Sequence, residues 1–187
     1  MQSAVPLGEG GMLAVLGVET KEIQKMISKN FDKTKCYLAN DNSNGQVILS
    51  GKNSDLDIFS ENLKKNKIKN IKLPVSAPFH CELMKNATIQ MDRIISSQNF
   101  QNPKIKVISN VSASEYKNEE EIKKLLIKQI ESPVRWRESI NYMISRGTTS
   151  FVEIGPGKVL SGLIKRINKD VKVLNIDTLE DIQGINL

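Results

Sequence analysis

His80 is the only histidine in the 187 residues, and the imidazole is the one side chain whose ordinary pKa suits proton transfer near neutral pH. It lies in the segment Leu73-Pro-Val-Ser-Ala-Pro-Phe-His-Cys-Glu-Leu-Met84. A general base and a structural histidine are about equally compatible with this spacing. The neighbouring Cys81 suggests a thiol nucleophile, but adjacent residues of an extended chain point in opposite directions, so we expect Cys81 to pack in the core.

The elements that flank His80 must hold it in place. Ile71, Leu73 and Val75 alternate as in a half-buried strand, and Pro74 and Pro78 stiffen the chain that follows. Helical spacing begins just after the histidine, at Leu83, Ala87, Met91 and Ile94. His80 is therefore predicted at a strand-to-helix junction, where a rigid scaffold commonly presents a functional group.

Residues 12–73 show the pattern of one small unit. The pattern predicts strands over residues 11–17, 36–40, 46–50 and 71–75, with a turn at Asn44-Gly45 between the middle two. One predicted helix carries Ile23, Met26 and Ile27, and a second begins with Ser54 as its N-cap. The resulting order β-α-β-β-α-β is the ferredoxin-like arrangement.

Residues 74–187 alternate between predicted helices and strands. Strands are predicted over residues 104–109, 151–154 and 171–176, the second of them buried. Helices are predicted after His80, over 122–130, from Ser132-Pro133 onward, and over 160–167. Glu119-Glu-Glu121 is interpreted as favourable charge at a helix N-terminus. Gly155-Pro-Gly-Lys158 fails the phosphate-loop pattern, because Val159 follows the lysine, and is predicted to be a tight turn.

The composition limits the possible partners. The net charge is +6 and the sequence pI is about 9.2, but aromatic residues are 5% and no nucleic-acid motif is present, so we expect no nucleic acid. An acidic protein partner fits the charge equally well, as does a coding bias that places solvated lysines on every face. The apolar run Met12–Leu16 is too short to span a membrane, and no membrane partner is expected. Cys36 and Cys81 lack metal-ligand spacing, so we predict free thiols, no metal and a cytoplasmic location.

The segment Leu73–Met84 resembles the histidine motif of the malonyl-CoA:acyl-carrier-protein transacylases. Further blocks resemble this family in its order and spacing, up to about Arg166. They are Met1–Pro6, Gly10–Ala14, Ala39–Gly51, Ser109–Ser112, Gln129–Trp136, Glu138–Ile140 and Glu153–Leu160.

The resemblance implies roles for five residues. His80 matches the family's general base, and the residue matching Gln129 holds that histidine through its backbone carbonyl. Phe79 matches a bulky position that favours malonyl over branched extender units, and Asn40 and Asn42 match positions near the acyl pocket. Malonyl-CoA and acyl carrier protein are the implied substrate and partner, with no cofactor.

The family's nucleophile is a serine in a Gly-His-Ser-Leu-Gly type elbow, and no such elbow occurs in the 187 residues. In the family it lies upstream of the block that begins at Met1, as does the arginine that binds the malonyl carboxylate. We therefore expect a C-terminal part of a transacylase that is inactive alone and works with a separate N-terminal chain. The alternatives are a non-catalytic module that binds acyl carrier protein and a decayed fragment.

The expected fold class is α/β, with a ferredoxin-like small subdomain inserted in an incomplete, α/β-hydrolase-like parallel-sheet core. Residues 1–11 are assigned to a remnant of the large subdomain, 12–73 to the small subdomain, and 74–187 to the C-terminal half of the large one. We expect residues 74–187 to be the less stable portion, because parallel strands need cover and neighbours.

Overall fold

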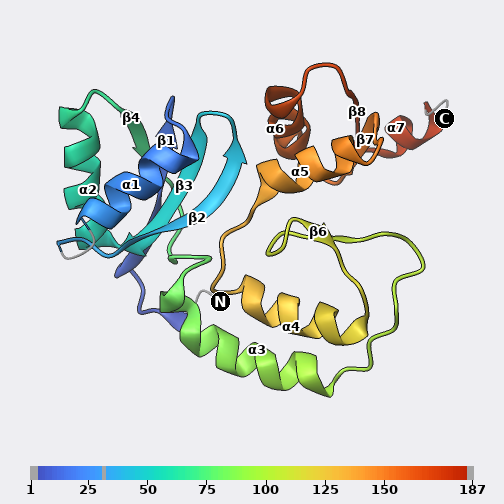
Figure 1. Ribbon diagram of the computed structural model, residues 1–187, viewed down its shortest axis with the longest axis horizontal. Coiled ribbons are helices and arrows are strands. Elements are labelled where there is room, and N and C mark those ends of the chain that lie inside the picture. The colour runs from blue at the N-terminus through green and yellow to red at the C-terminus, as the bar shows by residue number, and fades with distance from the viewer. Residues whose placement is uncertain (1–3, 31–32, 185–187) are drawn as a thin grey trace. The chain divides into compact units, whose positions relative to one another are not determined.

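The computed structural model describes residues 4–30 and 33–184, so the start of the predicted block Met1–Pro6 lies outside the described residues (Figure 1). The chain divides into two compact units, Met1–Ser139 and Ile140–Leu187, and each is described by itself. Within the described part of the chain, no helix is long and apolar enough to cross a membrane.

The first unit opens with the predicted order β-α-β-β-α-β, which is confirmed. Its elements are β1 (Gly10–Leu16), α1 (Thr20–Asn30), β2 (Cys36–Ser43), β3 (Gln46–Lys52), α2 (Asn53–Lys65) and β4 (Lys69–Lys72). The strands form one antiparallel sheet in the order β2-β3-β1-β4. The predicted turn between β2 and β3 is present, with Gly45 at a φ of 69° that favours glycine.

Strand alternation gives this sheet two different faces. On one face Leu13, Val15, Val47 and Leu49 pack with side chains of α1 and α2, including Ile23 and Phe59, in one buried cluster. On the other face a smaller cluster forms, and partly buried Leu73 and Phe79 pack against it. Its members are Met12, Ala14, Ala39 and Ile48. The second face is therefore the one that meets the His80 segment.

Two predicted boundaries, one of a strand and one of a helix, are wrong by two or three residues. The last strand ends at Lys72 and not at Val75, because Pro74 has no N–H to donate and the ladder stops there. The second helix begins at Asn53, so Ser54 is not its N-cap; no side chain caps this end, and the Asn53 amide instead donates to the Gly8 carbonyl at 2.6 Å.

The rest of the first unit contains the 3-10 turn η2 (Glu82–Met84), α3 (Lys85–Ser97), β5 (Ile108–Ser109), β6 (Ser114–Glu115) and α4 (Glu119–Gln129). Figure 1 shows α3 and α4 side by side, and the two helices are in contact. Asn118 caps α4, and Glu119–Glu121 form its first turn as predicted. The predicted strand over 104–109 is wrong except for its last two residues; Ile105 is 77% exposed and pairs with no strand.

The helix predicted from Ser132-Pro133 begins later, as α5 (Trp136–Ser145). Residues 132–135 do not join it because Val134 is bonded elsewhere: its N–H donates to the Ala39 carbonyl at 2.8 Å, and its carbonyl accepts from the Asp41 N–H at 3.0 Å. A short parallel bridge therefore links Asn40 and Val134 beside β2.

The second unit begins within α5 and continues through β7 (Ser150–Ile154), α6 (Val159–Ile167), β8 (Lys172–Ile176) and α7 (Leu179–Gln183). The strands β7 and β8 pair in parallel, with α6 as their crossover helix. The prediction that 151–154 is buried is wrong for Val152 and Ile154, which are 45% and 79% exposed. The apolar sequence of a two-sided parallel strand is present, but the described residues do not cover both sides.

Candidate active site

His80 lies in a tight turn between two buried residues. Pro78 and Cys81 are both buried, and the Cys81 thiol donates to the Pro78 carbonyl at 3.1 Å. His80 itself has a φ of 61°, a left-handed conformation that is uncommon outside glycine although histidine is among the residues that adopt it. Such conformations cost on the order of 1–3 kcal/mol and occur where the surrounding structure fixes them, often at functional sites.

Gly10 at the start of β1 lets this turn approach the sheet. A Cβ added to Gly10 would lie 2.3 Å from Cδ of Pro78, which is closer than any real contact of this kind. The absence of a side chain on Gly10 is therefore required for the position of Pro78, and so for the turn that carries His80.

The imidazole of His80 is held by the last residue of α4, Gln129. Its Nδ1 lies 3.1 Å from the backbone carbonyl oxygen of Gln129. A proton on Nδ1 donated to this carbonyl leaves Nε2 as the acceptor, which is the tautomer that a general base needs. Ile130, next in sequence, packs in a buried cluster with Ala77 and Met84 from the two sides of the histidine turn. The carbonyl and the turn are thus fixed to the same small core.

A pocket of about 380 Å³ opens at His80 on the sheet face opposite α1 and α2. It contains four of the predicted site residues, His80, Phe79, Asn40 and Asn42, while Gln129 contacts the histidine through its carbonyl. Five further residues line it: Met12, Ala14, Gln46, Ile48 and Leu73. These five were not predicted as site residues, although strand alternation places Met12, Ala14 and Ile48 on one face and could have identified them.

The lining supplies a base, amides and an apolar wall, but it has no nucleophile and no carboxylate. The thiol of Cys81 does not fill this role, because it is buried and burial raises its pKa. The prediction that Cys81 packs in the core is confirmed. In the described ranges, no group of three or more histidine, cysteine or acidic side chains is arranged to bind a metal ion.

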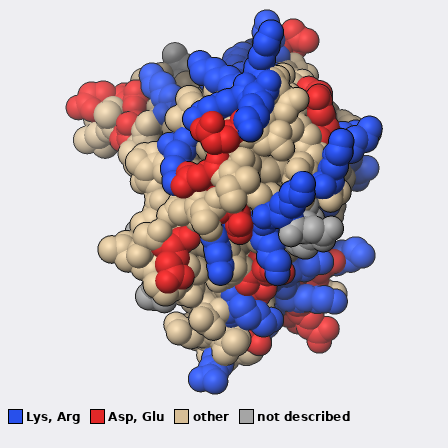
Figure 2. All heavy atoms as spheres, turned by 90° about the vertical axis from the view of Figure 1, so that its left-hand side faces the viewer, with Lys and Arg blue, Asp and Glu red and all other residues tan. Residues whose placement is uncertain are grey.

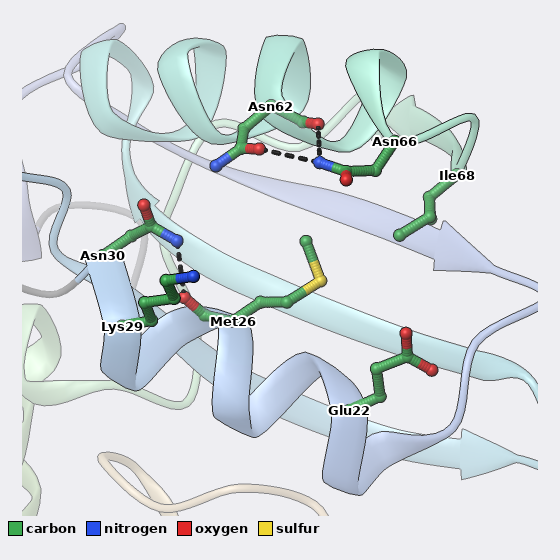
Figure 3. Close-up of a pocket in the computed structure, with 7 residues that line it drawn as sticks. All are labelled: Glu22, Met26, Lys29, Asn30, Asn62, Asn66 and Ile68. Carbon is green, nitrogen blue, oxygen red and sulfur yellow. Dashed lines mark hydrogen bonds between the residues drawn. The ribbon is translucent and has the colours of Figure 1, made fainter.

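A second pocket, of about 510 Å³, lies between α1 and α2 (Figure 3). Its asparagines bond nearby groups of their own helices: Asn30 donates to the Met26 carbonyl at 2.8 Å, and Asn66 donates to the Asn62 side chain at 2.9 Å. None of its lining residues is a histidine, serine or cysteine, and none is a predicted site residue.

Residues 1–180 match the acyl transferase domain family, and the chain belongs to this family.

More particular similarity is to proteins named malonyl CoA-acyl carrier protein transacylase. The chain is 42% identical over 185 residues to the one from Bacillus subtilis (strain 168), and 40% identical over 188 residues to the one from Staphylococcus aureus (strain COL). The match covers 98% and 100% of this chain but only 58% and 61% of those proteins. The chain thus spans about three fifths of the length of these relatives.

Solved structures show similarity to the same kind of protein, again over about three fifths of its length. The structure of malonyl CoA-acyl carrier protein transacylase from Clostridium perfringens matches with a TM-score of 0.93 and 38% identity, over 98% of this chain and 58% of that one. A type II PKS acyl-carrier protein in complex with its malonyl-transacylase matches with a TM-score of 0.91 and 31% identity, over 98% and 60%.

Proposed function

We propose that this chain supplies the general base and the acyl pocket of an enzyme that transfers malonyl from malonyl-CoA to the phosphopantetheine thiol of acyl carrier protein in fatty acid biosynthesis. The observation that carries the proposal is the 3.1 Å contact between His80 Nδ1 and the Gln129 carbonyl, at the edge of a pocket that also holds Phe79, Asn40 and Asn42. The names of the relatives support the choice of substrate and partner.

In this mechanism, Nε2 of His80 takes the proton of a serine hydroxyl as its oxygen attacks the malonyl thioester. The C–S bond breaks, the proton passes to the departing CoA sulfur, and a malonyl-serine ester remains. His80 then takes the proton of the carrier-protein thiol, which attacks the ester and forms the new thioester. The proton returns to the serine oxygen, and no cofactor takes part.

The serine is proposed to come from a segment outside these 187 residues, on the same polypeptide or on a separate chain. His80 is the only histidine and is followed by Cys81, so a Gly-His-Ser elbow does not occur in this sequence. The exposed side chains Val152, Ile154 and Leu174 form the surface that such a segment would cover. Without it we expect no transfer activity.

The proposed subdomains follow the same division. Residues 12–73 form a ferredoxin-like small subdomain, which the strand order β2-β3-β1-β4 supports. Residues 1–11 and 74–187 belong to an α/β-hydrolase-like large subdomain whose other strands lie in the serine-bearing segment. The parallel pair β7–β8 supports this assignment. A cytoplasmic location fits the two free thiols, Cys36 and Cys81.

Phe79, Asn40 and Asn42 are proposed as substrate-binding residues. Phe79 narrows the pocket beside His80 and thereby favours malonyl over branched acyl groups. The half-buried amides of Asn40 and Asn42 face the same pocket and can donate to acyl oxygens.

The test is a malonyl-transfer assay on the chain alone and mixed with the serine-bearing N-terminal segment of the Bacillus subtilis relative. We expect activity only in the mixture, and a fall of roughly 10²–10⁴-fold for His80→Ala. Asn62→Ala in the pocket between α1 and α2 is the matched control and should leave activity unchanged. Transfer by the chain alone, or full activity of folded His80→Ala in the mixture, would overturn the proposal.

A non-catalytic carrier-binding module is the alternative, and one observation favours it. Residues 12–73 contain eleven lysines, no arginine and seven acidic residues. Figure 2 shows lysines on the face that carries α2, but carboxylates stand among them, and Lys64–Glu61 and Lys72–Asp57 are ion pairs. If binding is the whole function, Lys→Glu changes on this face weaken carrier binding at low salt, and the mixture stays inactive although both parts are folded. An insoluble chain would indicate a decayed fragment.

A further inference from the structure

Asp41 and Arg137 form a part-buried ion pair that the sequence pattern does not suggest. The residue Asp41 is only 3% exposed, and the Arg137 guanidinium binds its carboxylate with two nitrogens, Nε at 2.9 Å from Oδ1 and Nη2 at 2.8 Å from Oδ2. The Thr20 hydroxyl donates to the same Oδ1 at 2.9 Å. A two-nitrogen contact fixes orientation as well as distance, which a lysine in place of the arginine could not do.

The position of Asp41 explains why a charge is tolerated there. Thr20 is the first residue of α1, and Arg137 is the second residue of α5, so the carboxylate lies at the N-termini of two helices. Helix N-termini favour negative charge. The buried carboxylate is thus stabilised by two helix ends and one guanidinium.

The ion pair lies at the end of a segment that begins at Gln129, the residue whose carbonyl contacts His80. From Gln129 the chain turns, with the Gln129 amide donating to the Ser132 carbonyl at 2.9 Å, and then runs beside β2 through the two backbone bonds of Val134. Arg137 ends this segment at Asp41, whose neighbours Asn40 and Asn42 line the pocket. The segment therefore has one end on His80 and the other on the strand that carries the acyl pocket.

We propose that Asp41 and Arg137 are positioning residues: their ion pair holds the 129–137 segment so that the Gln129 carbonyl keeps His80 protonated on Nδ1. The inference rests on the proposed function for its consequence in catalysis. Its structural content, the control of one imidazole tautomer, can be measured without any transfer reaction.

The experiment is ¹⁵N NMR of the imidazole, and His80 is the only histidine, so its ring signals need no assignment. In the unchanged chain at a pH where the ring is neutral, the proton should lie on Nδ1 and the two ring shifts should be well separated. Arg137→Gln and Asp41→Asn should move the shifts toward each other as the Nε2–H tautomer appears. Arg137→Lys should give an intermediate result, because it keeps the charge and loses the two-nitrogen contact.

Controls separate positioning from general destabilisation. Asp57→Asn removes the exposed ion pair between Asp57 of α2 and Lys72 of β4, and it should leave both ring shifts unchanged. Ring shifts that are the same in folded Arg137→Gln and in the unchanged chain would overturn the inference. If Arg137→Gln does not fold, Arg137→Lys answers the same question, and unchanged shifts there would also count against it.

An activity measurement then separates this inference from the proposed function. In the mixture with the serine-bearing segment, kcat should fall with the Nδ1-protonated fraction, by several-fold to roughly a hundredfold, while KM for malonyl-CoA stays the same. Altered shifts in a mixture that never transfers malonyl would retain the positioning role and reject the proposed reaction. Altered shifts with an unchanged kcat would overturn the catalytic consequence.

Discussion

The sheet β1–β4 and the pair β7–β8 differ in how much of their apolar surface the chain itself covers. The four-stranded sheet has a buried cluster of ten residues, seven of them in its strands and α2 at 0–1% exposure, including Val47, Leu49 and Phe59. The two-stranded pair leaves Val152, Ile154 and Leu174 at 45%, 79% and 42% exposure. The sheet β1–β4 has a packed core of its own, whereas the described residues leave apolar side chains of β7 and β8 uncovered.

This difference corresponds to how the two parts are used. An antiparallel sheet with helices on one face can be complete in one short stretch of chain, and its other face is free to form the pocket beside His80. A parallel pair is normally part of a longer sheet covered on both sides. The sheet β1–β4 therefore supplies the wall of the pocket with Asn40 and Asn42, whereas His80 and Gln129 come from the chain that follows it.

The largest expected difference is in amide hydrogen exchange. Local opening free energies range from near zero up to the free energy of global unfolding, so we expect amides of β1 and β3 to exchange more slowly than those of β7 and β8 by roughly a thousandfold or more. Adding the serine-bearing segment should slow exchange in β7 and β8 and leave β3 unchanged. Equal protection of both sheets in the chain alone would contradict the comparison.

Two isoleucines allow a matched test of core packing. Ile23 in α1 is fully buried and Ile154 in β7 is 79% exposed. We expect Ile23→Ala to lower the free energy of unfolding of the first unit by about 2–5 kcal/mol, and Ile154→Ala to change stability by no more than about 0.5 kcal/mol. Urea denaturation followed by circular dichroism measures both, and equal losses would show that β7 is buried in solution.

Alkaline pH should act on the first unit through Cys36. Burial, and then the charge of Asp55, raise the pKa of this thiol from 9.0 to about 12. Below pH 9 the thiol is neutral in the folded and in the unfolded chain, and its contribution to stability is complete. Above pH 9 the thiol of the unfolded chain ionises first, so stability is lost progressively toward pH 12. Urea midpoints over pH 8–11 should fall less for Cys36→Ala than for the unchanged chain. If the urea midpoints of the two proteins fell equally with pH, the thiol of Cys36 would be in contact with water in the folded chain.

The sequence predicts local order better than long-range contacts. Apolar alternation and the Asn44-Gly45 turn predict the six elements of residues 12–73, because these signals depend on neighbours in the chain. The contact of His80 with Gln129 spans 49 positions and came from a family resemblance, since no periodicity relates the two residues. The pair Asp41–Arg137 spans 96 positions and was missed for the same reason.

Errors in the prediction have a common physical origin. Residues 104–109 have the alternating pattern of a strand, but only Ile108–Ser109 find a partner, and a strand without a partner does not form. Ser132-Pro133 has the chemistry of a helix start, but the backbone of Val134 is bonded to β2. In both cases tertiary pairing decides the outcome, and the local pattern does not contain it.

The smallest expected effects come from two glycines, and they should differ in sign. A methyl group at Gly10 meets the Pro78 ring, so Gly10→Ala should destabilise the first unit by about 1–3 kcal/mol and shift the turn that carries His80. Gly162 lies inside α6 with open space around it, so Gly162→Ala should stabilise that helix by about 0.5–1 kcal/mol. Thermal unfolding of both variants provides the comparison. If Gly162→Ala lowered the stability of the chain alone, the space around α6 would be filled. The contrast between the sheet β1–β4, which the chain covers, and the uncovered pair β7–β8 would then fail.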